Sequence, residues 1–367
     1  MNSENGVPVS VVITAYNSER FVADAIRTVR GQSVRPHEII LVDDGSSDRT
    51  AEIANSLGVT VLTQPNAGSA AARNAGTRAA SAPWIAYLDV DDLWVPEKLE
   101  LQWTALQQNP GAGFSFCEFA VFDEAGIVTP ANLARRADYA GVVRRPVGGT
   151  TVYAGRESLA RQLFIGDFVL PSSLLVRRAA IVAIGGFDET MRRCEDYEFI
   201  LRLVRVADAV IVERRAVCYR LHESNKSASW HGALLARNQI AERIATSPHR
   251  YPAAAGALFS APRLANINAA AKALLRGQRY GEAREIALAG MREAPSWRGV
   301  AAILLSHMLG VAPLSALHSA VRSVKNRLAP PVARTAEWAG AELDLLRALA
   351  GDEARRPAVT PYALPSS

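Results

Sequence analysis

Short apolar runs alternate with stretches of helical periodicity through the first hundred residues of the chain. Four runs rich in β-branched or aromatic residues predict buried strands, at residues 9–16, 37–46, 59–65 and 83–90. Between them, apolar positions at helical spacing predict helices over residues 17–32, 47–58 and 67–81. Strands and helices that alternate in this way form βαβ units, so we predict an α/β fold with a parallel sheet and helices on its faces.

The pattern becomes mixed after residue 113. Four segments carry predictions there: a strand over residues 113–123, a strand and a helix over 169–189, a helix over 194–207, and a strand or hairpin over 209–222. Gly185 and Gly186 are placed to end the helix within residues 169–189, because glycine readily adopts the left-handed conformation at a helix terminus. Residues 124–160 hold several glycines and basic residues and are predicted to be rich in loops.

The composition changes again in the last third of the chain. Residues 232–350 are rich in Ala, Leu, Arg and Glu and predict a helical region, and the tail over residues 351–367 is predicted to be disordered. The nearest candidate for a membrane span, residues 300–321, is interrupted by two histidines and a proline, so we expect no spanning helix. Residues 297–328 combine apolar residues with basic flanks, which leaves two alternatives for the helical region, a packing annex or a membrane-surface platform.

The overall composition narrows the class of protein. The chain has 367 residues, of which 49% are hydrophobic and 21% charged, and this is enough for one large domain or two ordinary ones. The net charge of +5 is too diffuse to indicate nucleic acid as a partner. Cys117, Cys194 and Cys218 have no C-x-x-C spacing, so we interpret them as small hydrophobic residues in a reducing compartment.

Polar side chains follow three of the predicted strands, in "TAYN", "VDDGSSD" and "DVDD". In a parallel α/β sheet, ligands bind beyond the carboxyl ends of the strands. We therefore expect one crevice to hold Thr14, Asp43, Asp44, Asp89 and Asp91. Carboxylates that lie close together repel one another, so a cation or a metal ion is their natural partner.

The acidic cluster of Asp89, Asp91 and Asp92 has two interpretations. In the first, the cluster is the end of a strand, and Asp92 caps a helix that follows over residues 92–102. In the second, one carboxylate binds Mg²⁺ or Mn²⁺, whose other ligands are waters and substrate phosphates. The second acidic strand end, at Asp43, favours the metal.

Four other features have both a structural and a functional interpretation. "VDDGSSDRT" is a capped turn, a phosphoacceptor pocket or a contact for a nucleobase and ribose. Arg73, a long cation in a helix of small residues, forms a surface salt bridge or binds a diphosphate. Glu195 and Asp196 open a helix favourably, or one of them is a general base. His222 is structural, or it contacts a metal ion or a phosphate.

The motifs "VSVVITAYN", "VDDGSSDRT", "ARNAG", "YLDVDD", "GGFDE" and "CEDYEF" occur in this order, and together they resemble the glycosyltransferase family 2 pattern over about residues 7–225. The resemblance implies a GT-A nucleotide-diphospho-sugar transferase fold with a central, mostly parallel sheet, followed here by the α-helical C-terminal region. It also implies a nucleotide-diphosphate sugar donor, a divalent metal ion (Mn²⁺ or Mg²⁺) and inversion at the anomeric carbon.

The resemblance also implies roles for particular residues. The implied nucleotide-sugar contacts are Thr14, Ala15, Tyr16, Asp43, Asp44, Arg73 and Asp89. The implied metal ligand is Asp91, with Asp92 and His222 as further candidates. The implied catalytic base is Asp196, with Glu195 beside it.

The expected function is therefore glycosyl transfer to an acceptor hydroxyl on a glycan or a lipid-linked acceptor, in polysaccharide or glycoconjugate synthesis for the cell envelope. Two alternatives remain, a nucleotidyltransferase that makes a nucleotide sugar and a non-catalytic nucleotide-sugar-binding protein. We expect a cytoplasmic location, with peripheral contact at the inner face of the cytoplasmic membrane through the C-terminal helices as the alternative.

The predicted domain organisation follows from these assignments. Residues 1–230 are the GT-A catalytic domain, with a nucleotide-sugar half over about residues 7–113 and an acceptor half over about residues 114–230. The helical C-terminal region covers residues 231–350, and the tail covers residues 351–367.

Overall fold

The computed structural model describes residues 6–164, 166–222, 225, 230–253 and 255. Most of the predicted helical region over residues 231–350, and all of the tail over residues 351–367, lie outside these residues. The predicted domain boundaries therefore stay predictions.

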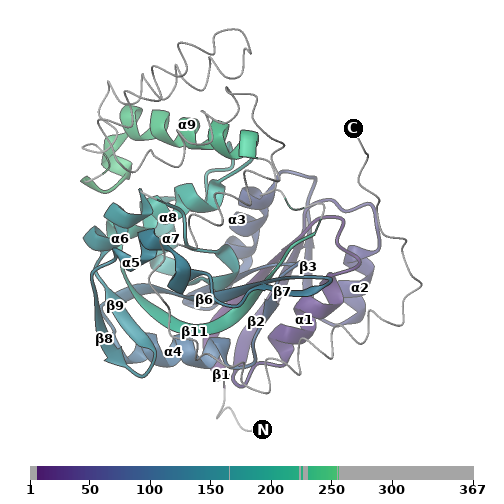
Figure 1. Ribbon diagram of the computed structural model, residues 1–367. Helices are drawn as coiled ribbons and strands as arrows, with labels where there is room; N and C mark the ends of the chain where they lie inside the picture. The colour runs from purple at the N-terminus through teal and green to yellow at the C-terminus, as the bar shows by residue number, and fades with distance from the viewer. Residues whose placement is uncertain (1–5, 165, 223–224, 226–229, 254, 256–367) are drawn as a thin grey trace, which may run out of the picture.

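The first half of the chain forms a parallel sheet in the order β3-β2-β1-β4 (Figure 1). Its strands are β1 (Gly6–Ala15), β2 (Arg35–Asp43), β3 (Thr60–Thr63) and β4 (Trp84–Asp89). The helices between them are α1 (Val22–Arg30), α2 (Thr50–Ser56) and α3 (Ser69–Ala79). The predicted βαβ units are confirmed, because the four parallel strands alternate with helices. Strands β1, β2 and β4 supply buried core residues, whereas β3 at the edge of the sheet is partly exposed.

The second half continues the same sheet in the order β10-β6-β11-β9-β8. Its strands are β5 (Leu93–Trp94), β6 (Ala112–Asp123), β7 (Gly126–Thr129), β8 (Arg144–Gly148), β9 (Thr151–Ala154), β10 (Leu175–Arg177) and β11 (Asp208–Arg220). The short strand β10 is antiparallel to both β4 and β6, so β6 and its parallel partner β11 point in the same direction as β1–β4. The predicted central, mostly parallel sheet is therefore confirmed.

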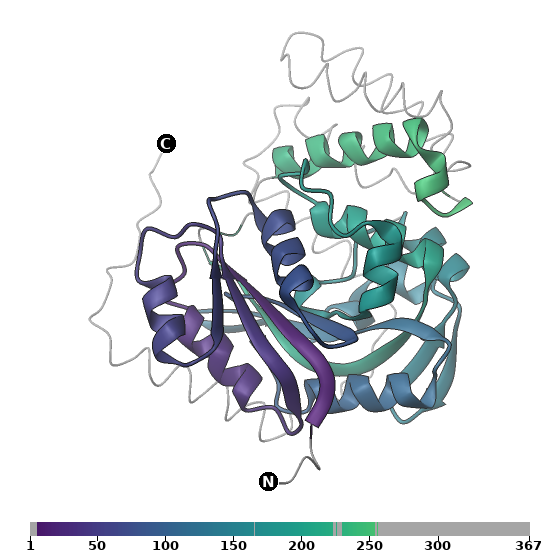
Figure 2. The same cartoon turned by 180° about the vertical axis from the view of Figure 1, so that it is seen from behind.

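Helices cover both faces of the sheet, and α9 lies beyond α7 and α8 (Figure 2). The helices of this half are α4 (Lys98–Gln108), α5 (Ala137–Ala140), α6 (Arg156–Leu163), α7 (Arg178–Ile184), α8 (Glu195–Val206) and α9 (Trp230–Thr246). Short 3₁₀ turns lie at Leu133–Arg135, Pro171–Ser173 and Pro248–Arg250. None of the helices in the described part of the chain has the length and hydrophobicity needed to cross a bilayer.

Of the two alternatives over residues 209–222, the strand is confirmed, since β11 is one long strand that pairs with β6 along most of its length. Two other local predictions are wrong. Residues 124–160 are not mainly loop, because three strands and two helical segments lie wholly within them. The helix expected from residue 92 begins at Lys98, because Leu93 and Trp94 are extended and pair with β11. The predicted glycine stop is confirmed, since Gly185 adopts a left-handed conformation after α7.

Helix α3 lies unusually close to the sheet at Gly76. A Cβ atom at this position would be 2.3 Å from Cγ1 of Val12 and 3.2 Å from Cγ2 of Val42. Real Cβ atoms do not approach other atoms so closely, so the small residue allows α3 to pack directly on β1 and β2. Arg73 lies one helical turn before Gly76 and is carried toward the ends of the strands by this packing.

Candidate active site

The ends of β1 and β4 bring two predicted site residues together. Thr14 is opposite Asp89 in the parallel ladder, and its hydroxyl donates a 3.1 Å hydrogen bond to Oδ1 of Asp89. Ala15 is opposite Asp43 at the end of β2, and Tyr16 follows with 49% of its surface exposed. The expected convergence of strand ends is therefore present, and it leaves the Tyr16 ring at the surface, where it can contact a ligand.

The carboxylates of Asp43 and Asp44 bind backbone and side-chain donors of the neighbouring loops. Asp44 is buried and accepts hydrogen bonds from Nε2 of Gln64 and from the backbone N–H groups of Ala67 and Gly68, at 2.7 to 2.9 Å. Asp43 accepts bonds from the hydroxyl and backbone N–H of Ser46. Asp44 therefore positions the segment that leads into α3, and its role toward a nucleobase or ribose stays a prediction.

Arg73 lies inside the protein and connects the two halves of the site. Its Nη2 donates to Oδ1 of Asp89 at 2.7 Å, and its Nη1 donates to Oε1 of Glu195 at 2.9 Å. Burial alone would lower its pKa, but the negative charges of Asp89 and Glu195 outweigh burial and raise it. A surface salt bridge is therefore the wrong interpretation. The side chain is only 4% exposed, and both of its terminal nitrogens are bound, so a direct diphosphate contact would require rearrangement.

Asn74, next to Arg73 in α3, has no role in the predicted site, but it binds the segment that precedes α8. Its side chain donates to the carbonyl of Phe187 and to Glu189, and it accepts from the backbone N–H of Phe187, at 2.8 to 2.9 Å. Phe187 stacks on Phe199 of α8 with ring centroids 3.9 Å apart, and the Arg73 guanidinium lies 5.3 Å from its centroid. The available signal was an amide next to Arg73 in a helix made mostly of small residues.

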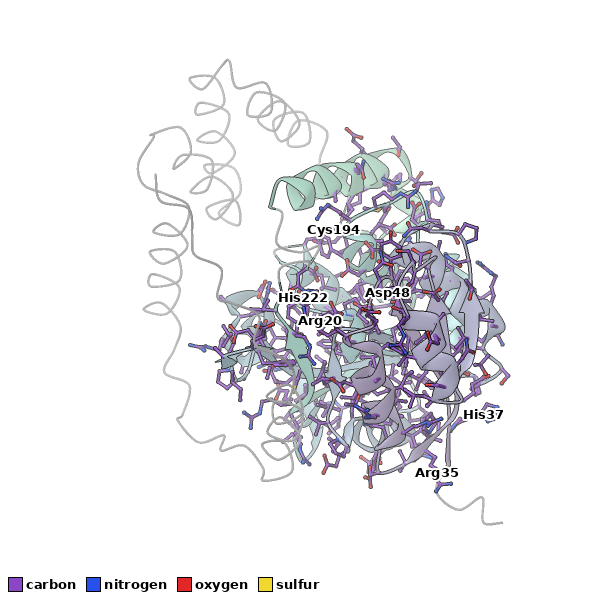
Figure 3. All side chains as sticks on the ribbon, turned by 90° about the vertical axis from the view of Figure 1, so that its right-hand side faces the viewer. Arg20, Arg35, His37, Asp48, Cys194 and His222 are labelled. Carbon is purple, nitrogen blue, oxygen red and sulfur yellow. The ribbon has the colours of Figure 1, made fainter. Side chains whose placement is uncertain are left out.

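Asp91 and His222 form a partly exposed pair beyond the ends of β4 and β11. Nε2 of His222 lies 2.9 Å from Oδ2 of Asp91, and 25% of the Asp91 side chain and 17% of the His222 side chain are exposed. Phe21 contacts the His222 ring at a centroid distance of 5.0 Å, and Arg20 lies over the same Phe21 ring, which agrees with the adjacent labels of His222 and Arg20 in Figure 3.

This pair suits a divalent metal ion in its chemistry. One carboxylate oxygen and one imidazole nitrogen are adjacent and reachable from solvent. Within the described residues, no group of three or more His, Cys, Asp or Glu side chains could hold a metal ion. Such ions are commonly held by one or two carboxylates together with substrate phosphates, so Asp91 fits as the ligand and His222 is a neighbouring nitrogen donor.

Asp92 does not cap a helix, and its position does not suit a metal ligand. The residue is fully buried. Its Oδ2 accepts a 2.6 Å bond from the hydroxyl of Ser172, and its Oδ1 accepts a 3.1 Å bond from the backbone N–H of Arg220. Burial and the neighbouring charges of Asp91 and Asp89 raise its pKa well above the usual carboxyl value. Both of its oxygens are therefore directed into the protein.

Glu195 and Asp196 occupy the first turn of α8. Cys194, which precedes them, has a φ of 54°, a left-handed conformation that is uncommon for a residue with a side chain. Asp196 is partly exposed, and desolvation, with the charges of Glu195 and Asp167, raises its pKa to about 8. A carboxylate whose pKa lies near the working pH is well matched to general-base catalysis.

Part of this site lies in a segment whose sequence matches a known family. Residues 10–165 match the model of glycosyl transferase family 2. The chain carries a family 2 glycosyltransferase domain. The amylovoran biosynthesis glycosyltransferase AmsB of Erwinia amylovora is 27% identical over 205 residues, which cover 53% of this chain and 64% of that protein. The UDP-Glc:alpha-D-GlcNAc-diphosphoundecaprenol beta-1,3-glucosyltransferase WfgD of Escherichia coli is 34% identical over 125 residues, or 33% of this chain and 49% of that protein.

The chain therefore spans less than two thirds of the length of these relatives. Crystal structures of S. aureus TarS residues 1–349 are similar in fold. One superposes with a TM-score of 0.52 at 14% identity and covers 82% of this chain and 91% of that one. The structure in complex with UDP-GlcNAc gives a TM-score of 0.50 at 15% identity, with 95% and 91% covered. The predicted GT-A fold is confirmed.

Proposed function

We propose that this chain is an inverting glycosyltransferase, which moves a sugar from a nucleotide-diphosphate donor to an acceptor hydroxyl in polysaccharide or glycoconjugate synthesis. One observation carries the proposal. The buried guanidinium of Arg73 binds Asp89 at the end of β4 and Glu195 in the first turn of α8 at the same time. The strand end that carries Asp89 and the first turn of α8, where the candidate base Asp196 follows Glu195, are therefore joined by one side chain, as a transfer between two substrates requires.

The proposed reaction assigns one task to each part of the site. Asp196 removes the proton of the acceptor hydroxyl while that oxygen attacks the anomeric carbon of the donor sugar. The bond from this carbon to the diphosphate oxygen breaks on the opposite face, its electron pair leaves with the nucleoside diphosphate, and the configuration is inverted. Thr14 and Asp89 contact the nucleoside side of the donor. Asp91 and His222 would hold a divalent metal ion, which supplies charge neutralisation for the departing diphosphate.

The names of the relatives support the substrate classes. AmsB is named for amylovoran biosynthesis, WfgD for transfer of glucose to a diphosphoundecaprenol-linked sugar, and one TarS structure holds UDP-GlcNAc. We extend these only as classes, a nucleotide-diphosphate sugar as donor and a glycan or lipid-linked acceptor. The sugar, the nucleobase and the linkage are left open.

Product analysis with a panel of nucleotide sugars, in the presence of Mn²⁺ or Mg²⁺ and with glycan and lipid-diphosphate acceptors, tests the proposal. We expect a transferred sugar of inverted anomeric configuration and loss of product in Asp196→Asn. Release of pyrophosphate would identify a nucleotidyltransferase. Donor binding without turnover across the whole panel would favour a non-catalytic binding protein.

A cytoplasmic location, with peripheral contact at the inner face of the cytoplasmic membrane, completes the proposal. The predicted contact segment, residues 297–328, lies outside the described residues. Flotation of the full chain with vesicles of anionic lipid tests this contact, with a chain truncated before residue 297 as the control. Equal flotation of the two chains would overturn the segment's predicted role.

A further inference from the structure

The turn formed by residues 89–92 is held by three separate elements. The backbone N–H of Val90 donates to the carbonyl of Thr14 in β1, and the carbonyl of Asp91 accepts from Nε of Arg220 in β11. The third element is the 3₁₀ turn Pro171–Ser173, where the hydroxyl of Ser172 is fully buried under the acidic cluster.

The Ser172 hydroxyl makes two hydrogen bonds to this turn. It accepts from the backbone N–H of Asp89 at 3.1 Å and donates to Oδ2 of Asp92 at 2.6 Å. Its rotation is therefore fixed from both sides. The other carboxylate oxygen of Asp92 binds the backbone N–H of Arg220, two residues before His222. One hydroxyl thus connects the strand end that carries Asp89 to the strand end that carries His222.

The backbone carbonyls of the segment that holds Ser172 are themselves bound by buried side chains. Nε1 of Trp94 donates to the carbonyl of Ser172 at 2.8 Å, and Nε2 of Gln102 donates to the carbonyl of Ser173 at 2.8 Å. Nζ of Lys98 approaches the carbonyl of Leu174 at 3.5 Å. Three successive backbone carbonyls therefore bind buried side chains, and this leaves the Ser172 hydroxyl little freedom to move.

We infer that Ser172 is a positioning residue for the acidic turn. Its hydroxyl sets the backbone at Asp89, and through Asp92 it sets the distance between Asp91 and His222. The Ser172 hydroxyl is not itself proposed to contact the donor or the metal ion. It acts through Asp89, and through Asp92 on the pair of Asp91 and His222. The consequence for donor binding rests on the proposed function, whereas the consequence for the turn does not.

Ser173 provides a matched control within the same turn. It is also fully buried, and its hydroxyl also makes one short bond, 2.7 Å to the carbonyl of Leu170, but the bond does not reach the acidic turn. Ser172→Ala and Ser173→Ala remove the same atom from neighbouring residues. A general loss of packing affects both variants, whereas loss of positioning affects only Ser172→Ala.

The first measurement is amide hydrogen exchange of the full chain without any ligand. In Ser172→Ala we expect the Asp89 amide to exchange about tenfold faster, as loss of one buried hydrogen bond implies. Ser173→Ala should leave this rate unchanged. Ser172→Cys, which retains a weak donor and acceptor, gives an intermediate rate and replaces the alanine variant if that variant does not fold. Equal rates at Asp89 in all variants, or an equal increase in both alanine variants, would overturn the inference.

The second measurement is calorimetric binding of UDP with and without Mn²⁺. We expect Ser172→Ala to weaken the Mn²⁺-dependent part of the affinity about tenfold, because Asp91 and His222 lose their spacing, and Ser173→Ala to match the wild-type chain. If the exchange result holds and the wild-type chain binds no nucleoside diphosphate in a wider panel, the proposed function fails and the positioning role stands. If UDP binds equally to both variants, the link from Ser172 to the metal pair is wrong.

Discussion

The two halves of the sheet supply their site residues in different ways. In the first half, Thr14, Asp43 and Asp89 lie at the ends of adjacent parallel strands joined by short helical crossovers. In the second half, Glu195 and His222 come from elements more than a hundred residues beyond the side chains that they contact, Arg73 and Asp91. The site therefore assembles only after the second half has packed on the first, and its integrity reports this packing.

Substitution of Arg73 should cause the largest loss of stability, because this side chain connects the two halves of the sheet. Arg73→Met leaves the carboxylates of Asp89 and Glu195 without their shared cation, and loss of one partner from a buried ion pair costs about 3–5 kcal/mol. Urea denaturation measures the free energy of unfolding. Arg78→Met is the control, because its 3.6 Å pair with Glu189 is exposed and such pairs contribute about 0–1 kcal/mol. Equal losses in the two variants would contradict the connecting role of Arg73.

Asp196→Asn should stop the chemistry and leave both halves assembled. We expect kcat to fall by about 10²–10⁴-fold, the usual contribution of a general base, with donor affinity unchanged. Steady-state kinetics and a nucleotide-binding assay separate the two effects. Asp188→Asn is the control, because its carboxylate binds Thr190 and Arg243, away from the proposed reaction. Retained turnover in Asp196→Asn would remove Asp196 from the role of base.

The pH dependence should follow the raised pKa of Asp196. Because a base must be ionised, kcat/KM is expected to rise with pH until about 8 and then level off. Asp167→Asn removes one of the charges that raise this pKa, so the rise should move to lower pH while the Arg73 pairs persist. A profile that stays in place in this variant would show that another group controls it.

The same pKa sets a stability trend of definite sign. Between the ordinary carboxyl value of 3.8 and about 8, the folded state holds the Asp196 proton more tightly than the unfolded state. This contribution to stability is complete below the lower value and is lost as the pH rises through the higher one. Asp196→Asn should flatten that part of the stability curve in urea titrations at several pH values.

Substitution of Lys98 should have the smallest effect on stability, since its side chain is buried against Trp94 and is not one of the predicted site residues. Lys98 is fully buried over the Trp94 ring, and burial lowers its pKa to about 7. Between pH 7 and 10.5 the unfolded state therefore binds more protons, so stability should rise with pH. Lys98→Met should remove this rise and change the unfolding free energy at pH 7 by less than about 1.5 kcal/mol. An unchanged slope would contradict the assignment.

The first half could be predicted closely from the sequence because its structure depends on local patterns. The apolar run at residues 9–16 corresponds to β1 (Gly6–Ala15), and strand order alone brings Thr14 next to Asp89. In the second half, single elements were also predicted, since residues 113–123 correspond to β6 and residues 194–207 to α8. The order of its strands could not be predicted, because it depends on pairing between distant segments. Strand β5 has only two residues, and it replaces the start of a predicted helix because β11 is available to pair with it.

The misjudged site residues have the same cause. Asp92 is a suitable helix cap in sequence, but its partner Ser172 is 80 residues away and draws the carboxylate inward. Arg73 is correctly placed near the site by its helix, but the direction of its guanidinium depends on α8 and Glu195. A single sequence carries no local signal for either contact, so these two side chains needed the packed structure.

The lack of a side chain at Gly76 has a consequence for the distance between α3 and the sheet. It allows α3 to approach the sheet more closely than any other residue type would permit, and the reach of the Arg73 guanidinium to Asp89 and Glu195 depends on that approach. One added methyl group at position 76 would displace the helix outward together with its arginine. The separation of α3 from the ends of the strands is therefore adjustable from a buried apolar position, and every polar residue of the site could be kept while it changes.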